Sequence, residues 1–166
     1  MSDAADIIAL GTQNQVSVSC AESLTGGEVA SHLVAVPGAS AVFRGGVVAY
    51  DPVIKNDLLG VDAAELFSTG SVSASVATQM AEGAQRLLGT DYAVATTGVA
   101  GPDPEPVSGQ APGVVFLAVA GSGLGTLVRE IALEGTREEI RARATRAALQ
   151  ALRDAMSHDF PEWGAQ

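Results

Sequence analysis

The stretch VSVSCAESLTGGEVASHL, residues 16–33, decides the fold of this chain. An apolar run at 16–20 ends at a small polar cluster at 22–27, and apolar residues then return at Val29, Ala30 and Leu33 with helical spacing. This order predicts a buried strand, a glycine-containing turn and a helix. A strand that leads through a short turn into a helix is the repeating unit of α/β proteins.

Strand and helix patterns continue to alternate along the rest of the chain. The sequence predicts helices at about 3–14, 25–36, 52–59, 62–67, 73–88 and 137–156. It predicts strands at 16–20, 43–50 and 92–97, followed by an antiparallel hairpin of VVFLAVA (114–120) and TLVREIAL (126–133). We therefore expect an α/β fold, a three-layer α/β/α sandwich with a mixed, mostly parallel sheet of about five strands. We expect one domain over 1–166, with a loose tail at about 157–166.

Composition and charge narrow the class of function. The net charge of −10 argues against nucleic-acid binding, which depends on neutralising phosphates. The first ten residues carry no basic segment ahead of an apolar block, and no apolar run approaches the roughly 18 residues that cross a bilayer. Cys20 is the only cysteine, which fits a reducing compartment. We therefore expect a cytoplasmic protein that binds neither nucleic acid nor a membrane.

Metal ligands are scarce in this chain. His32 and His158 are far apart, and neither has a cysteine or carboxylate at ligand spacing. We expect no metal site and no cofactor.

Lysine is nearly absent, because Lys55 is the only lysine among nine basic residues. Composition alone leaves two explanations open. A genome that favours arginine codons would leave one lysine by chance. Alternatively, Lys55 does what arginine cannot do, which is to release its proton and act as a base.

The turn at 21–27 combines two hydroxyls with two glycines at the start of a helix. The first backbone N–H groups of a helix lack internal partners and carry a positive partial charge, so they suit a phosphate or a developing oxyanion. The plainer alternative is that Thr25 or Ser23 caps the helix. One cap requires only one hydroxyl, however, and the other is then left for a further role.

Four blocks in order resemble the CinA C-terminal domain family. AESLTGG (21–27) is similar to its AES(C/L)TGG signature, and 37–40 with FRGGVVAYDPVIK (43–55) resembles its GxSxxFxGGxVxYxxxxK block. TTGVAGP (96–102) is similar to its (T/S)GIAGP loop, and GTREEIRARATRAAL (135–149) to its G(D/T)RxxIRxxA helix. Larger members carry an additional N-terminal domain, of which we expect no counterpart here.

The resemblance implies an amidohydrolase that converts nicotinamide mononucleotide (NMN) to nicotinic acid mononucleotide and ammonia, a step of NAD salvage. The family pattern makes Ser23 the nucleophile, working with Lys55 and Tyr50. In that role Tyr50 relays a proton or donates a hydrogen bond to Ser23. A lysine can activate a serine if burial lowers its pKa towards neutrality.

The nucleotide part of such a substrate needs hydroxyl and anion contacts. We expect the backbone of Leu24, Thr25, Gly26 and Gly27 to face the amide oxygen. The resemblance places Arg137 at the ligand, although an exposed arginine facing Arg141 is the alternative. Weaker candidates for ribose or phosphate contacts are Ser40, Thr96, Thr97 and Gly98.

One segment departs from the family pattern. Members commonly have GPxGG…KPVG in the long loop, whereas this chain reads GPDPEPVSGQAPG at 101–113, with Gln110 and Ala111 near the place of the lysine. A non-catalytic nucleotide-binding or regulatory module therefore remains an alternative, as does hydrolysis of another amide. We expect a homo-oligomer, of which a symmetric dimer is the simplest form.

Overall fold

The computed structural model describes residues 2–121, 123 and 125–157. Five strands form one mixed sheet in the order β2-β1-β3-β4-β5. Their bounds are β1 Val18–Glu22, β2 Phe43–Val48, β3 Tyr92–Gly98, β4 Val114–Gly121 and β5 Gly125–Ala132. Strand β1 pairs in parallel with β2 and β3, whereas β4 is antiparallel to both β3 and β5. The carboxyl ends of β1, β2 and β3 therefore meet at one edge of the sheet.

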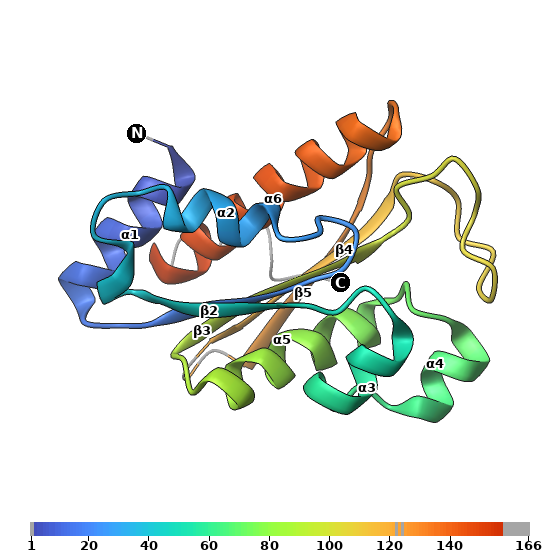
Figure 1. Cartoon of the computed structure of the whole chain (residues 1–166), viewed down its shortest axis with the longest axis horizontal. Coiled ribbons are helices and arrows are strands. Elements are labelled where there is room, and N and C mark those ends of the chain that lie inside the picture. Colours follow the sequence, from blue (N-terminus) through green and yellow to red (C-terminus); the bar gives the residue numbers. More distant parts are fainter. Residues whose placement is uncertain (1, 122, 124, 158–166) are drawn as a thin grey trace.

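Helices cover both faces of the sheet (Figure 1). One layer contains α1 (Asp3–Asn14), α2 (Glu28–Val34) and α6 (Arg137–Ser157), and the other contains α3 (Pro52–Leu59), α4 (Ala63–Thr69) and α5 (Ala74–Leu88). A short 3₁₀ helix, Ala39–Ala41, precedes β2. The predicted three-layer α/β sandwich is confirmed.

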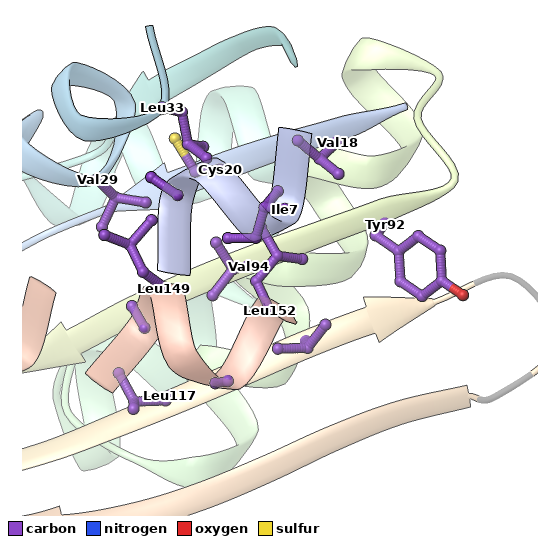
Figure 2. Packing of buried hydrophobic residues seen from close by; sticks show 14 of the residues in the cluster. Ile7, Val18, Cys20, Val29, Leu33, Tyr92, Val94, Leu117, Leu149 and Leu152 are labelled. Carbon is purple, nitrogen blue, oxygen red and sulfur yellow. The ribbon is translucent and has the colours of Figure 1, made fainter. Parts of the chain in front are cut away.

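Two apolar cores result, one on each side of the sheet. In the first, side chains of α1, α2 and α6, including Ile7, Leu33 and Leu152, pack on Val94 and Leu117 of the sheet (Figure 2). In the second, α5 packs on alanines of β3 and β4. These small residues let the helix lie close to the strands, which have almost no exposed surface.

A glycine in α5 allows α3 to pack closely against that helix. A Cβ on Gly83 of α5 would lie 2.0 Å from the carbonyl oxygen of Leu59, the last residue of α3. Only glycine permits this contact. The position of α3 matters because it carries Lys55.

Element boundaries differ from the predicted ones mainly at the opening stretch. Strand β1 continues to Glu22, and α2 begins at Glu28 rather than near Thr25. The reason is that Gly26 and Gly27 have φ angles of 59° and 102°, which no helix can accommodate. A capping box starts α6, since Thr136 N–H donates to the Glu139 carboxylate and Glu139 N–H donates to the threonine hydroxyl.

The predicted tail falls largely at 158–166, outside the described residues. Within the described ones, no helix is both long enough and apolar enough to span a bilayer.

Candidate active site

Ser23 lies directly after β1, at the edge where the three parallel strands end. Its N–H donates to the carbonyl oxygen of Thr96 at 3.1 Å, so the pairing of β1 with β3 continues one residue beyond the strand. The residue is 8% exposed. The hydroxyl is thus held at a defined place at the start of the 23–27 turn.

Lys55 reaches this hydroxyl from α3. Its Nζ lies 2.9 Å from Ser23 Oγ, although 32 positions separate the two residues in the sequence. The lysine is 1% exposed. Asp51 fixes the start of α3 by accepting the N–H of Val53, which sets the turn of helix that carries the lysine. The fold therefore brings the predicted nucleophile and the predicted base into contact.

Burial lowers the pKa of Lys55 from 10.5 to about 8, against a smaller opposing effect of the Asp51 carboxylate. Two backbone oxygens orient the amine, with Nζ 2.6 Å from the carbonyl of Ala49 and 3.2 Å from that of Tyr50. A neutral amine has two N–H donors and one lone pair. With both donors on these carbonyls, the lone pair faces Ser23 Oγ, which is the arrangement of a general base.

Glu22 is a buried carboxylate that the sequence reasoning did not single out. It is 1% exposed and accepts the N–H groups of Gly27, Val29 and Ala30 at 3.0, 3.1 and 2.9 Å. These are donors at the start of α2. An acidic residue that ends an apolar run just ahead of a helix was the available signal. The protein therefore fills the positive end of α2 with its own anion.

The prediction that Gly26 and Gly27 present their N–H groups to a ligand is corrected by this arrangement. Gly27 N–H is bound to Glu22, and Gly26 N–H donates to the Ser23 carbonyl oxygen at 3.1 Å. In the described part of the chain, by contrast, the N–H of Leu24 meets no acceptor. The same is true of Thr25, which has no exposed surface. Leu24 follows the serine directly, the position from which hydrolases with a strand–turn–helix nucleophile stabilise an oxyanion.

The threonines near the serine bind other parts of the protein. The hydroxyls of Thr25 and Thr96 lie 2.8 Å apart and are buried, so they hold the turn against β3. Thr97 points to the other face of the sheet, where its hydroxyl donates to the carbonyl of Ser71 at 2.6 Å. The hydroxyls of Thr25, Thr96 and Thr97 thus have structural partners, and the ligand contacts expected of Thr96 and Thr97 stay predictions.

Tyr50 does not place its hydroxyl on Ser23, in contrast to the expectation. That hydroxyl accepts a hydrogen bond from Arg137 at 3.1 Å, and the other terminal nitrogen of Arg137 donates to the carbonyl of Gly101 at 2.7 Å. Arg137 is exposed, and none of the ion pairs among the described residues includes it. Its charge therefore stands at the rim of the site without a carboxylate partner.

Arg141, one turn further along α6, ties the 23–27 turn to that helix. Its Nε lies 2.8 Å from the Leu24 carbonyl oxygen, and a terminal nitrogen lies 3.3 Å from that of Thr25. The same nitrogen pairs with Glu28 at 2.8 Å. Arg141 thus fixes the peptides next to the serine and is not a free surface cation.

Ser40 does not belong to this site in the chain as described. It precedes β2, which runs parallel to β1, so it lies at the opposite edge of the sheet from Ser23. Gly98 has a packing role, because a Cβ there would lie 2.7 Å from the carbonyl oxygen of Val114 on the neighbouring strand. The expected ligand contact of Ser40 is corrected on the ground of its position, whereas that of Gly98 stays a prediction.

The divergent loop at 101–113 is ordered by Glu105. Its carboxylate accepts the N–H of Val107 at 3.0 Å and the hydroxyl of Ser108 at 2.6 Å. Backbone hydrogen bonds between Val99 and the 113–114 pair close the base of the loop. The loop therefore has a defined shape without the lysine of the family pattern.

The described residues lack the side-chain groups that bind metal ions in proteins. In the part of the chain that the structure describes, no three His, Cys, Asp or Glu side chains gather closely enough to hold an ion.

Comparison with known proteins agrees with this architecture. The family described as the CinA C-terminal domain matches residues 2–156, and the chain belongs to that family. It is 42% identical over 147 residues to a CinA-like protein of Frankia casuarinae and 48% identical over 149 residues to one of Synechococcus sp.. These matches cover 89% and 87% of this chain but 33% and 34% of the relatives, so the chain spans about a third of their length.

Solved structures agree as well. The competence/damage inducible protein CihA of Agrobacterium tumefaciens superposes with a TM-score of 0.87 at 38% identity, over 93% of each chain. A CinA superfamily protein of Klebsiella pneumoniae gives 0.87 at 29% identity, over 94% of this chain and 96% of that one.

Proposed function

We propose that this protein is a serine amidohydrolase that deamidates NMN to nicotinic acid mononucleotide and ammonia. One observation carries the proposal: a buried lysine whose pKa is lowered to about 8 lies 2.9 Å from the hydroxyl of Ser23. The resemblance of the sequence blocks supplies the substrate, and membership of the family is consistent with it.

The first half of the reaction forms an acyl-enzyme. Neutral Lys55 takes the proton of the Ser23 hydroxyl while Oγ attacks the carboxamide carbon. The carbonyl oxygen becomes an oxyanion beside the N–H of Leu24. The carbon–nitrogen bond then breaks, and the Lys55 ammonium returns its proton to the leaving nitrogen, which departs as ammonia.

The second half releases the acid. Neutral Lys55 takes a proton from water, and the resulting hydroxide attacks the acyl carbon. The bond to Ser23 Oγ breaks, the lysine returns the proton to the serine, and the product leaves as the carboxylic acid, which then gives its proton to bulk water. Because Lys55 is neutral again after each half, one base serves both.

Arg137 is the group that we assign to the phosphate of the substrate. Its charge has no carboxylate partner among the described ion pairs, and its position at the start of α6 is unfavourable for a cation unless an anion binds there. The positive end of α2 is closed to that phosphate by Glu22.

The experiment that tests this function is ammonia release from NMN by the wild type and by Ser23→Ala. We expect release by the wild type and none above background by the variant. Undiminished release by the variant would rule out the covalent mechanism.

A non-catalytic nucleotide-binding module is the second candidate, because the loop at 101–113 lacks the lysine of the family pattern. Lys55→Met separates the two functions. A catalyst loses turnover with this variant, whereas a binding module shows no turnover in the wild type and retains most of its affinity. A panel of pyridine carboxamides with and without ribose phosphate tests hydrolysis of another amide in the same assay.

A further inference from the structure

We propose that Tyr50 is the platform on which the pyridinium ring of the substrate stacks, and that it is not a proton relay. This inference rests on the proposed function, because it assigns the part of the site that selects an aromatic amide. The contacts at the two ends of the tyrosine carry it.

The backbone end of Tyr50 lies at the base. Its carbonyl oxygen accepts a hydrogen bond from Lys55 Nζ at 3.2 Å. The hydroxyl end lies at the rim cation, where it accepts a hydrogen bond from Arg137 at 3.1 Å. The phenol ring therefore lies between the Ser23–Lys55 pair and the guanidinium of Arg137.

The Ser23–Lys55 pair, the Tyr50 ring and Arg137 follow one another in the same order as the matching groups of the proposed substrate. A nicotinamide nucleotide carries its carboxamide at one end, the aromatic ring next to it, and the sugar phosphate beyond the ring. With the carboxamide at Ser23 and the phosphate at Arg137, the ring falls beside Tyr50.

The ring of Tyr50 is available for such a contact. The residue is 61% exposed, although large aromatic side chains usually bury most of their surface. Val48 and Val53 beside it in the chain are also at least half exposed, at 50% and 60%. A pyridinium ring carries positive charge, and the face of a phenol ring attracts cations as well as aromatic partners.

The observed contacts do not support a role of Tyr50 as a proton relay. Lys55 already lies within hydrogen-bonding distance of Ser23 Oγ, so proton transfer between them requires no intermediary. The tyrosine hydroxyl is engaged at the far end of its own ring by Arg137.

Two variants separate the ring from the hydroxyl: Tyr50→Phe keeps the ring and Tyr50→Leu does not. For ammonia release from NMN, we expect Tyr50→Phe to lower kcat/KM about threefold through KM, because Arg137 loses one acceptor. We expect Tyr50→Leu to raise KM about tenfold further, the size of a stacking contact. A hundredfold fall of kcat in Tyr50→Phe would overturn the platform and establish a relay, and a Tyr50→Leu variant with the KM of Tyr50→Phe would overturn it as well.

Calorimetry with Ser23→Ala tests the platform without turnover. Adding Tyr50→Leu to this variant is expected to weaken NMN binding about tenfold more than it weakens binding of ribose 5-phosphate, which has no ring. Equal effects on both ligands would overturn the proposal. Because this measurement needs no catalysis, it distinguishes a wrong platform from a wrong reaction, which the wild-type ammonia assay reports.

Discussion

Lys55 Nζ lies 2.9 Å from Ser23 Oγ, and the carbonyls of Ala49 and Tyr50 hold the other two positions around that nitrogen. In the proposed mechanism, the backbone of the β2–α3 turn orients this lysine as a third side chain orients the histidine of a Ser-His-Asp triad. It directs the base, and it does so with two oxygens that no substitution of a side chain removes.

The pH dependence of the rate follows from the pKa of Lys55, which is about 8. Since only the neutral amine accepts the serine proton, kcat/KM for ammonia release should rise about tenfold per pH unit below that value and level off above it. A steady-state pH profile of NMN hydrolysis measures this. A rate that is flat between pH 6 and 8 would exclude Lys55 as the base.

Lys55→Arg is the matched variant for that profile, because arginine keeps the positive charge and cannot release it. We expect no ammonia release above background at any pH in this range. A variant that retained the wild-type profile would assign the titration to another group.

Stability should depend on the same group in a defined direction. The unfolded chain binds a proton at Lys55 up to about its ordinary pKa of 10.5, whereas the folded protein releases it near 8. Between these values the unfolded state holds more protons, so the free energy of unfolding rises with pH. Relative to Lys55→Met, the wild type should gain on the order of 2–3 kcal/mol across this window and nothing below it.

Urea unfolding of both proteins at pH 7 and pH 10 measures that difference, because titration of all other groups cancels between them. A constant difference would mean that the lysine has the same pKa in both states.

Glu22→Gln tests the carboxylate that caps α2. The amide keeps the size of the side chain but replaces one of the two acceptor oxygens by an NH2 group, so at least one of the backbone N–H groups of Gly27, Val29 and Ala30 faces a donor. We expect a loss of about 2–4 kcal/mol in the free energy of unfolding. Glu105→Gln, which alters a partly exposed carboxylate with similar backbone contacts, should cost about 1 kcal/mol. Equal losses would show that burial of Glu22 adds nothing.

Arg141→Ala tests the attachment of the nucleophile turn to α6. Without the guanidinium, the carbonyls of Leu24 and Thr25 lose their partner, and the N–H of Leu24 is less well placed. We expect kcat to fall about tenfold with a smaller change of KM. Arg143→Ala on the same helix removes an exposed arginine that bonds to the Glu134 carbonyl, and it should change kcat less than about twofold. The opposite order of effects would exclude a positioning role for Arg141.

The layers of the fold could be predicted because they depend on the periodicity of apolar residues. The contact of Ser23 with Lys55 could be predicted only through the resemblance, since no local pattern spans 32 positions. The position of Ser40 could have been deduced from the sequence. Ser40 precedes β2 and Ser23 follows β1, and in parallel strands these two positions lie at opposite edges of the sheet. Which groups the carbonyl and the hydroxyl of Tyr50 contact depends on the direction of the backbone, which sequence patterns do not specify.

The charge of Arg141 reaches the candidate oxyanion site through two peptide groups in series. The guanidinium binds the Thr25 carbonyl, and the same peptide unit ends in the N–H of Gly26, which donates to the Ser23 carbonyl. That second peptide unit ends in the N–H of Leu24. Hydrogen bonds in a chain polarise one another, so each carbonyl that accepts makes the N–H at the other end of its peptide a stronger donor. Arg141 of α6 thereby makes the N–H of Leu24 a stronger hydrogen-bond donor, although the guanidinium does not contact that N–H group.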